Sequence, residues 1–156
     1  MQTSPWLRFL VRDQAFALPL SAVAEVANAS APRLIPQVPH ELGGVVNFRG
    51  EPLPALDGAA LFGAEAGGVR RHLVVLGDAR LRIGLLVSEV LRIERSLDGA
   101  VALDEPEPRP PEFAEWVRFA GEPLGLIAPE ELLDRATKLL TEQRIQGGTM
   151  PWHDAF

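Results

Sequence analysis

The chain has 156 residues with a formal net charge of −6, and 47% of its residues are hydrophobic and 23% charged, as in an ordinary soluble globular domain. The negative charge, without any cluster of Lys or Arg, argues against a nucleic-acid partner, because a phosphate backbone would be repelled. The absence of cysteine excludes disulfides, thiolate metal ligands and a cysteine nucleophile, and it suits a reducing compartment.

Short apolar runs separated by turn residues fill the first half of the chain, and this pattern predicts β-strands. The expected elements are a strand, its partner strand, a helical turn and a third strand, at 7–11, 15–18, 19–22 and 23–26. A β-hairpin is predicted over Gly43–Asp57, where two apolar runs flank an Arg-Gly bend. Asp57 is the expected N-cap of a short helical turn at 58–62.

The second half of the chain follows the same pattern and ends in a longer helix. Its strands and its hairpin are expected at 72–76, 81–87, 90–93 and 116–127. Residues 97–112 are acidic and rich in proline, which predicts an exposed connection. An apolar face along 129–143, with Pro129 in the first turn, predicts an amphipathic helix, and 146–156 are expected to form a flexible tail.

Three short stretches of the first half recur in the second half in the same order. The matching pairs are 9–13 with 74–78, 18–21 with 85–88, and 48–53 with 119–124. Each half contains about five short strands, which suits a small closed barrel without free sheet edges. We therefore predict a mainly β fold of two pseudo-symmetric five-stranded lobes, lobe one at about 20–70 and lobe two at about 72–128, with strand exchange between them.

The two predicted hairpins differ at the bend. The first bend reads Arg49-Gly50, whereas the second reads Ala120-Gly121. Gly50 can take a positive φ without steric cost, and Asn47 is of a type that hydrogen-bonds its own backbone in turns, so we expect both to shape the bend. A turn does not need arginine, so we infer that the first hairpin uses Arg49 for a second purpose.

Motifs for catalysis and for metal or phosphate binding are missing from the sequence. The three histidines lie far apart, and there is neither a nucleophile elbow nor a phosphate-cradling loop. We therefore expect a protein that is not an enzyme and needs no cofactor or metal; an unrecognised carboxylate site is the enzymatic alternative. No signal peptide is recognisable and no apolar run approaches the ~18 residues of a membrane span, so we expect a cytoplasmic protein without direct membrane insertion.

Four stretches resemble motifs of the CheW-like adaptor domain family of bacterial chemotaxis. They lie at 23–26, 44–50, 54–57 and 84–90. The resemblance covers roughly 7–140 and implies a CheW-like domain at 1–145, built as two five-stranded SH3-like β-barrels that share a hydrophobic seam. It also implies a scaffold that couples the tip of chemoreceptors to the regulatory domain of a CheA-type histidine kinase at cytoplasmic receptor arrays. Other CheW-like domains are further candidate partners.

The resemblance also assigns candidate roles to single residues. Glu25 and Arg49 match a family pair that looks like an ion pair bracing the first lobe, and the pair serves either bracing alone or bracing together with partner binding. Val23 matches a position on a receptor-facing groove, although an ordinary core valine would look the same. Gly43 and Gly44 allow a close backbone approach, either within the barrel or by a partner.

Two positions depart from the family pattern. Ala59 stands where the family often has Arg or Lys, and Phe48 replaces the usual Leu. A relative that serves gliding, twitching or another chemosensory-like system therefore stands beside a general chemotaxis adaptor. The alternative outside chemotaxis is a twin-barrel module that binds a peptide or a small molecule.

Two aromatic residues, Trp152 and Phe156, lie in the C-terminal tail. They are similar to the Trp-x-x-Phe tether with which some chemoreceptors recruit a methyltransferase or methylesterase, although one more residue separates the aromatics here. Three interpretations stay open. The tail packs on its own barrel, is disordered, or acts as a peptide ligand for a partner.

Overall fold

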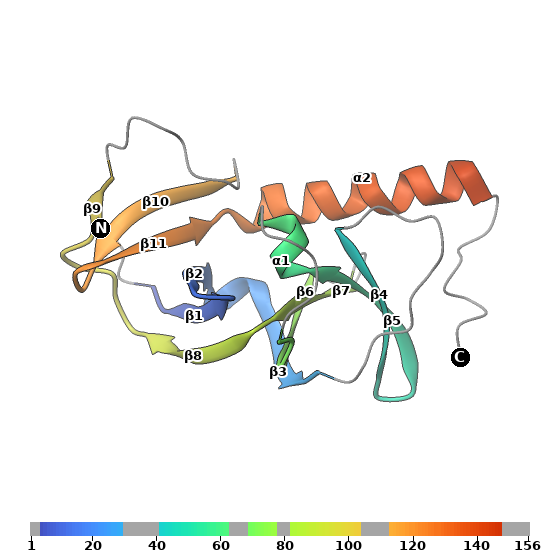
Figure 1. Cartoon of the computed structure of the whole chain (residues 1–156), viewed down its shortest axis with the longest axis horizontal. Coiled ribbons are helices and arrows are strands. Elements are labelled where there is room, and N and C mark those ends of the chain that lie inside the picture. The colour runs from blue at the N-terminus through green and yellow to red at the C-terminus, as the bar shows by residue number, and fades with distance from the viewer. Residues whose placement is uncertain (1–3, 30–40, 63–68, 78–81, 104–112, 148–156) are drawn as a thin grey trace.

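The structure is a computed structural model that describes residues 4–29, 41–62, 69–77, 82–103 and 113–147. Its elements, in chain order, are β1 Trp6–Val11, β2 Gln14–Pro19, the 3-10 turn η1 Leu20–Ala22, β3 Val23–Asn28, β4 Leu42–Phe48, β5 Glu51–Asp57, α1 Gly58–Leu61, β6 His72–Gly77, β7 Arg82–Val87, β8 Glu89–Glu94, β9 Val101–Ala102, β10 Ala114–Phe119, β11 Glu122–Ile127 and α2 Pro129–Gly147. Figure 1 shows two sheets side by side, with α2 running from the end of β11 past α1 toward β4.

Five strands of each sheet follow the same order once each strand is replaced by its counterpart in the other half of the chain, and the short strand β9 adds a sixth strand to one sheet that the five-stranded prediction did not include. One sheet runs β8-β1-β2-β11-β10-β9, and the other runs β3-β6-β7-β5-β4. In each sheet a parallel pair lies near the centre, β2 with β11 and β5 with β7, while the other pairings are antiparallel. The predicted mainly β fold of two pseudo-symmetric lobes is therefore confirmed.

The strand exchange between the lobes is more extensive than the predicted boundaries allow. β6 and β7 join the sheet of β3–β5, which we call lobe one, whereas β1 and β2 join the sheet of β8–β11, which we call lobe two. The boundary predicted near residue 70 therefore does not separate the lobes. The two halves carry the same apolar pattern, so that pattern cannot distinguish a hairpin that pairs with its own half from one that pairs with the other.

Three clusters of apolar side chains form the core. The largest lies between the lobes and beneath α2, where the rings of Phe16 and Phe62 are 4.4 Å apart and those of Phe16 and Trp116 are 5.4 Å apart. The buried face of α2 carries Leu132 and Ala136, so the predicted amphipathic helix is present. The two smaller clusters fill the interiors of lobe one and lobe two separately.

Candidate partner-binding surface

The hairpin bend between β4 and β5 is a tight two-residue turn. Arg49 and Gly50 both have positive φ, 54° and 81°, which matches the backbone twist of hairpin strands. The backbone N–H of Gly50 donates to the side-chain oxygen of Asn47 at 2.8 Å. Ala120 and Gly121 adopt the same conformation, φ 53° and 82°, so the two bends have the same shape and differ only in their side chains.

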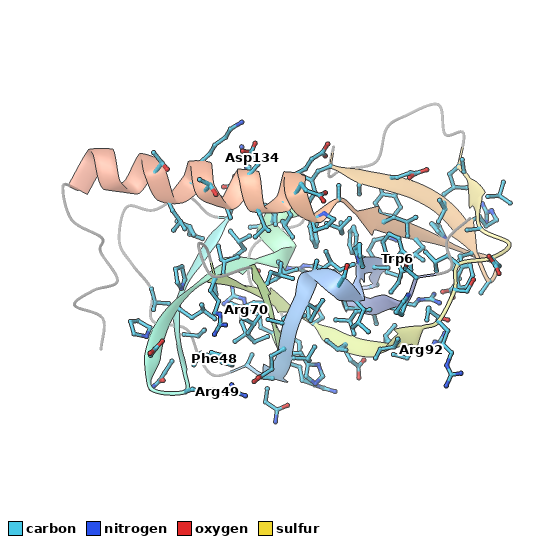
Figure 2. The ribbon with its side chains drawn as sticks, turned by 180° about the vertical axis from the view of Figure 1, so that it is seen from behind. Trp6, Phe48, Arg49, Arg70, Arg92 and Asp134 are labelled. Atoms are coloured by element: carbon cyan, nitrogen blue, oxygen red, sulfur yellow. The ribbon has the colours of Figure 1, made fainter. Side chains whose placement is uncertain are left out.

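Arg49 extends from this bend to the opposite edge of the same sheet. Its guanidinium forms an ion pair with Glu25 on β3. It also lies over the ring of the neighbouring Phe48, 5.1 Å from the ring centroid, and Figure 2 labels Arg49 and Phe48 at this end of the lobe. Since β3 and β4 are the two edges of the lobe-one sheet, the pair joins both edges of the lobe. The Arg49 side chain is 70% exposed and that of Glu25 31%, so the pair stabilises the fold by at most about 1 kcal/mol.

Gly43 and Gly44 are buried within lobe one. A Cβ atom on Gly43 would lie 3.2 Å from Cβ of Asp57 and 3.3 Å from a methyl group of Leu86. Gly44 has φ 130°, and the register of β4 against β5 shifts between Leu42 and Gly44. The close backbone approach therefore occurs inside the barrel, and a contact of either glycine with a partner stays a prediction.

Val23 lies at the start of β3, where it is half-buried and packs against the central core cluster. The register of β3 against β6 shifts between Val23 and Glu25, so the strand bulges beside the ion pair. A role of Val23 in a receptor-facing groove stays a prediction. The two tail aromatics, Trp152 and Phe156, lie outside the described residues.

The sequence interpretation missed a buried ion pair beside the same hairpin. Asp57 is only 1% exposed, and Arg70, which is labelled in Figure 2, donates to its carboxylate at 2.7 Å. The other carboxylate oxygen of Asp57 accepts the backbone N–H of Ala59, which is the predicted N-cap. One signal in the sequence was available. Ala59 stands where the family often has Arg or Lys, so a basic partner for Asp57 could have been sought elsewhere in the chain.

In lobe two, charged side chains join the corresponding strands in a different way. Arg8 on β1 is 3% exposed and pairs with Glu94 on β8 at 3.5 Å and with Glu122 on β11 at 3.1 Å. Arg92 donates to the same Glu94 at 2.7 Å. The hydrogen bond from Arg92 is the largest cause that lowers the pKa of Glu94 below its ordinary value, and the charge and hydrogen bond of Arg8 lower this pKa further.

The lowered pKa of Glu94 predicts a loss of stability in acid. A depressed pKa stabilises the fold fully above the ordinary value of 4.5, and this contribution is lost as the pH falls below 4.5 through the folded-state pKa. Glu94→Gln should therefore be less stable than the wild type at pH 7 and should show a smaller further loss of stability between pH 5 and 3. Urea unfolding at a series of pH values measures both, and parallel pH profiles would contradict the assignment.

Among the described residues, no group of three or more His, Asp or Glu side chains is placed to hold a metal ion. None of the described helices is both long enough and apolar enough to cross a membrane. The lobe-one bend presents an exposed arginine beside a carboxylate and an aromatic ring, and such side chains are common in contacts between proteins.

The exchanged strands, the shared core and the paired hairpins define a twin-lobed β-barrel domain. The chain belongs to the CheW-like domain family, since the model of that family matches residues 5–137. The predicted membership of the CheW-like family is thus confirmed.

Two curated relatives come from rhizobia. The chain is 33% identical over 86 residues to a probable chemotaxis protein CheW of Rhizobium etli, and 34% identical over 86 residues to the chemotaxis protein CheW of Rhizobium meliloti. Each match covers 54% of this chain and 56% of the relative, so the chain spans about half the length of these curated relatives. The crystal structure of the scaffolding protein TtCheW from Thermoanaerobacter tengcongensis has a TM-score of 0.67 and 20% identity, over 82% of this chain and 90% of that one, and shows a shared fold.

Proposed function

We propose that this CheW-like scaffold protein is a non-catalytic adaptor that couples chemoreceptors to a CheA-type histidine kinase. The observation that carries the proposal is the family match over residues 5–137. In this role the protein works in the cytoplasm at receptor arrays, where other CheW-like domains are further neighbours. It acts by binding alone and needs neither a cofactor nor nucleic acid.

The geometry of lobe one supports a binding role for the hairpin bend. The Arg49 guanidinium is held by Glu25 and by the Phe48 ring, and most of its surface still faces solvent. A restrained arginine loses less side-chain entropy on binding, and its planar fork suits carboxylates of a partner. The second hairpin has the same backbone but presents Ala120, so the two lobes offer different surfaces to partners.

A pull-down with the regulatory domain of the CheA-type kinase from the same organism tests this proposal. We expect Arg49→Ala and Glu25→Ala to weaken binding about tenfold, since a central arginine typically contributes more than 1 kcal/mol to an interface. Both variants should stay folded, because the pair is largely exposed. Arg118→Ala is the matched control, since Arg118 is an exposed arginine next to the second bend.

Two outcomes of the pull-down have different meanings. Unchanged binding by the folded Arg49 and Glu25 variants would remove these two residues from the binding surface. No binding of the wild type to any co-encoded kinase would overturn the adaptor proposal itself.

A further inference from the structure

The interiors of the two lobes differ in chemistry although their strands correspond. Each lobe has a register shift in one pair of strands, β3 with β6 in lobe one and β1 with β8 in lobe two. Beside the shift, Val75 is the partner of Glu25 in lobe one, and Arg8 is the partner of Arg92 in lobe two. Arg8 therefore occupies the position that Val75 has in lobe one, and it is only 3% exposed. In lobe one, by contrast, Val75 belongs to the apolar cluster that fills that lobe.

Two buried donors on β1 lack an acceptor among the described residues. They are the indole N–H of Trp6 and the Nε–H of Arg8. Residues two apart in a strand lie on the same face, so both donors belong to the inner face of lobe two. Leaving a buried donor without an acceptor costs free energy, and of these two residues only Trp6 also lines a cavity, where a ligand could supply an acceptor oxygen.

Two cavities adjoin on this inner face. One has a volume of about 370 Å³ and is lined in part by Trp6, Phe113 and Glu131; the other, of about 360 Å³, is lined in part by Asp98. Both are lined by Glu115 and Leu126, which are cross-strand partners on β10 and β11. We call the six residues Trp6, Asp98, Phe113, Glu115, Leu126 and Glu131 the lobe-two groove.

The groove has an acidic rim over an apolar floor. Asp98, Glu115 and Glu131 are exposed, and no ion pair joins any of them to another described residue. Trp6 and Leu126, in contrast, are buried members of the lobe-two cluster. A complementary ligand would carry a cationic group for the carboxylates and apolar side chains for the floor. It would also carry a carbonyl oxygen that can accept the Trp6 N–H.

We propose that the lobe-two groove binds an extended peptide segment of a partner protein that carries Lys or Arg beside apolar side chains. Such a segment supplies the cation, the apolar side chains and the backbone carbonyl together. Residues 104–112, which carry four acidic residues and one arginine, do not have the composition of such a segment. Figure 2 shows Trp6 and Arg49 in different halves of the molecule, so this site is separate from the lobe-one hairpin surface.

The proposal can be tested with a random nonapeptide library displayed on phage and selected against the intact chain. We expect the selected peptides to combine Lys or Arg with apolar residues. A synthetic, fluorescein-labelled peptide of that sequence should bind with an affinity that falls as salt rises, and it should shift the Trp6 indole N–H signal in an NMR titration.

Charge-reversal variants identify the surface. Glu115→Lys combined with Glu131→Lys should weaken binding of the labelled peptide about tenfold or more. Glu130→Lys is the matched control, because Glu130 is an exposed neighbour of Glu131 on α2 that does not line the cavity, and it should change binding less than about twofold.

Three results would overturn the proposal. The first is that the selection yields no peptide, or only peptides without basic residues. The second is that Glu130→Lys weakens peptide binding as much as the Glu115 and Glu131 reversals do. The third is that the wild type is a dimer that the Glu115 and Glu131 reversals dissociate. The dimer would mean that a second copy occupies the groove. None of these results bears on the kinase pull-down, which depends on Arg49 and Glu25, so failure of one proposal is distinguishable from failure of the other.

Discussion

Replacing Phe16 by alanine should lower the free energy of unfolding by about 3–5 kcal/mol, as expected for a fully buried phenylalanine that leaves a cavity. Phe16 is 2% exposed, and its ring lies 4.4 Å from Phe62 and 5.4 Å from Trp116. Phe62 follows α1 at the end of the lobe-one hairpin, whereas Phe16 and Trp116 belong to lobe two. The ring therefore joins the two lobes, and its loss should also weaken their coupling.

Urea denaturation followed by tryptophan fluorescence and by far-ultraviolet circular dichroism measures this effect. We expect one cooperative transition for the wild type, with both signals changing together. Phe119→Ala is the control, because Phe119 is half-buried against the lobe-two cluster alone and should cost less than about 2 kcal/mol. Equal losses for the Phe16 and Phe119 variants would contradict the role of the central cluster in joining the lobes.

Removing the carboxylate of Asp57 should have the second largest effect. Asp57→Ala should lower the free energy of unfolding by about 2–4 kcal/mol, because it removes the cap of α1 and leaves the partly buried Arg70 without its partner. Asp57→Asn separates these two contributions. Asparagine keeps an oxygen that caps the helix but loses the charge, so its loss of stability should be smaller.

Thermal and urea unfolding of the two Asp57 variants, with Arg70→Ala beside them, measure the predicted order. The alanine variant should be the least stable of the three. If Arg70→Ala were as stable as the wild type and the two Asp57 variants lost equal stability, the ion pair would have no part in fixing the hairpin to α1.

The sequence alone was sufficient to predict the strand pattern and the repeat. The Arg49-Gly50 and Ala120-Gly121 bends were recognisable because glycine and a preceding short apolar run mark a tight turn, and the structure gives both the same φ values. The amphipathic helix was equally clear, since its apolar residues recur at helical spacing over several turns. These are local signals, which a sequence carries directly.

Contacts between distant segments were harder to predict. Strand exchange between the lobes was expected, but its extent was not, because both arrangements of the hairpins β1–β2 and β6–β7 bury the same residue types. Arg70 was missed because it is 13 residues from Asp57 and no periodic pattern links the two. The buried Arg8 and the lobe-two cavities were not recognised either, because one arginine within an apolar strand gives no sign of the carboxylates that meet it.

Ala59 and Arg70 together explain one departure from the family pattern. The family often has a basic residue two positions after the hairpin aspartate, and alanine stands there in this chain. Arg70 approaches the same aspartate from the segment that precedes β6. The positive charge beside Asp57 is thus present but comes from another part of the chain.

The most direct test of the adaptor proposal is a kinase assay with receptor-containing vesicles. The purified CheA-type kinase and vesicles that contain the chemoreceptor from the same organism are combined with this protein, and autophosphorylation is measured. The proposal predicts that the wild type raises kinase activity only when receptor is present, and that folded Arg49→Glu loses most of this rise. Kinase activity that is unchanged by the wild type, with receptor present, would contradict the proposal.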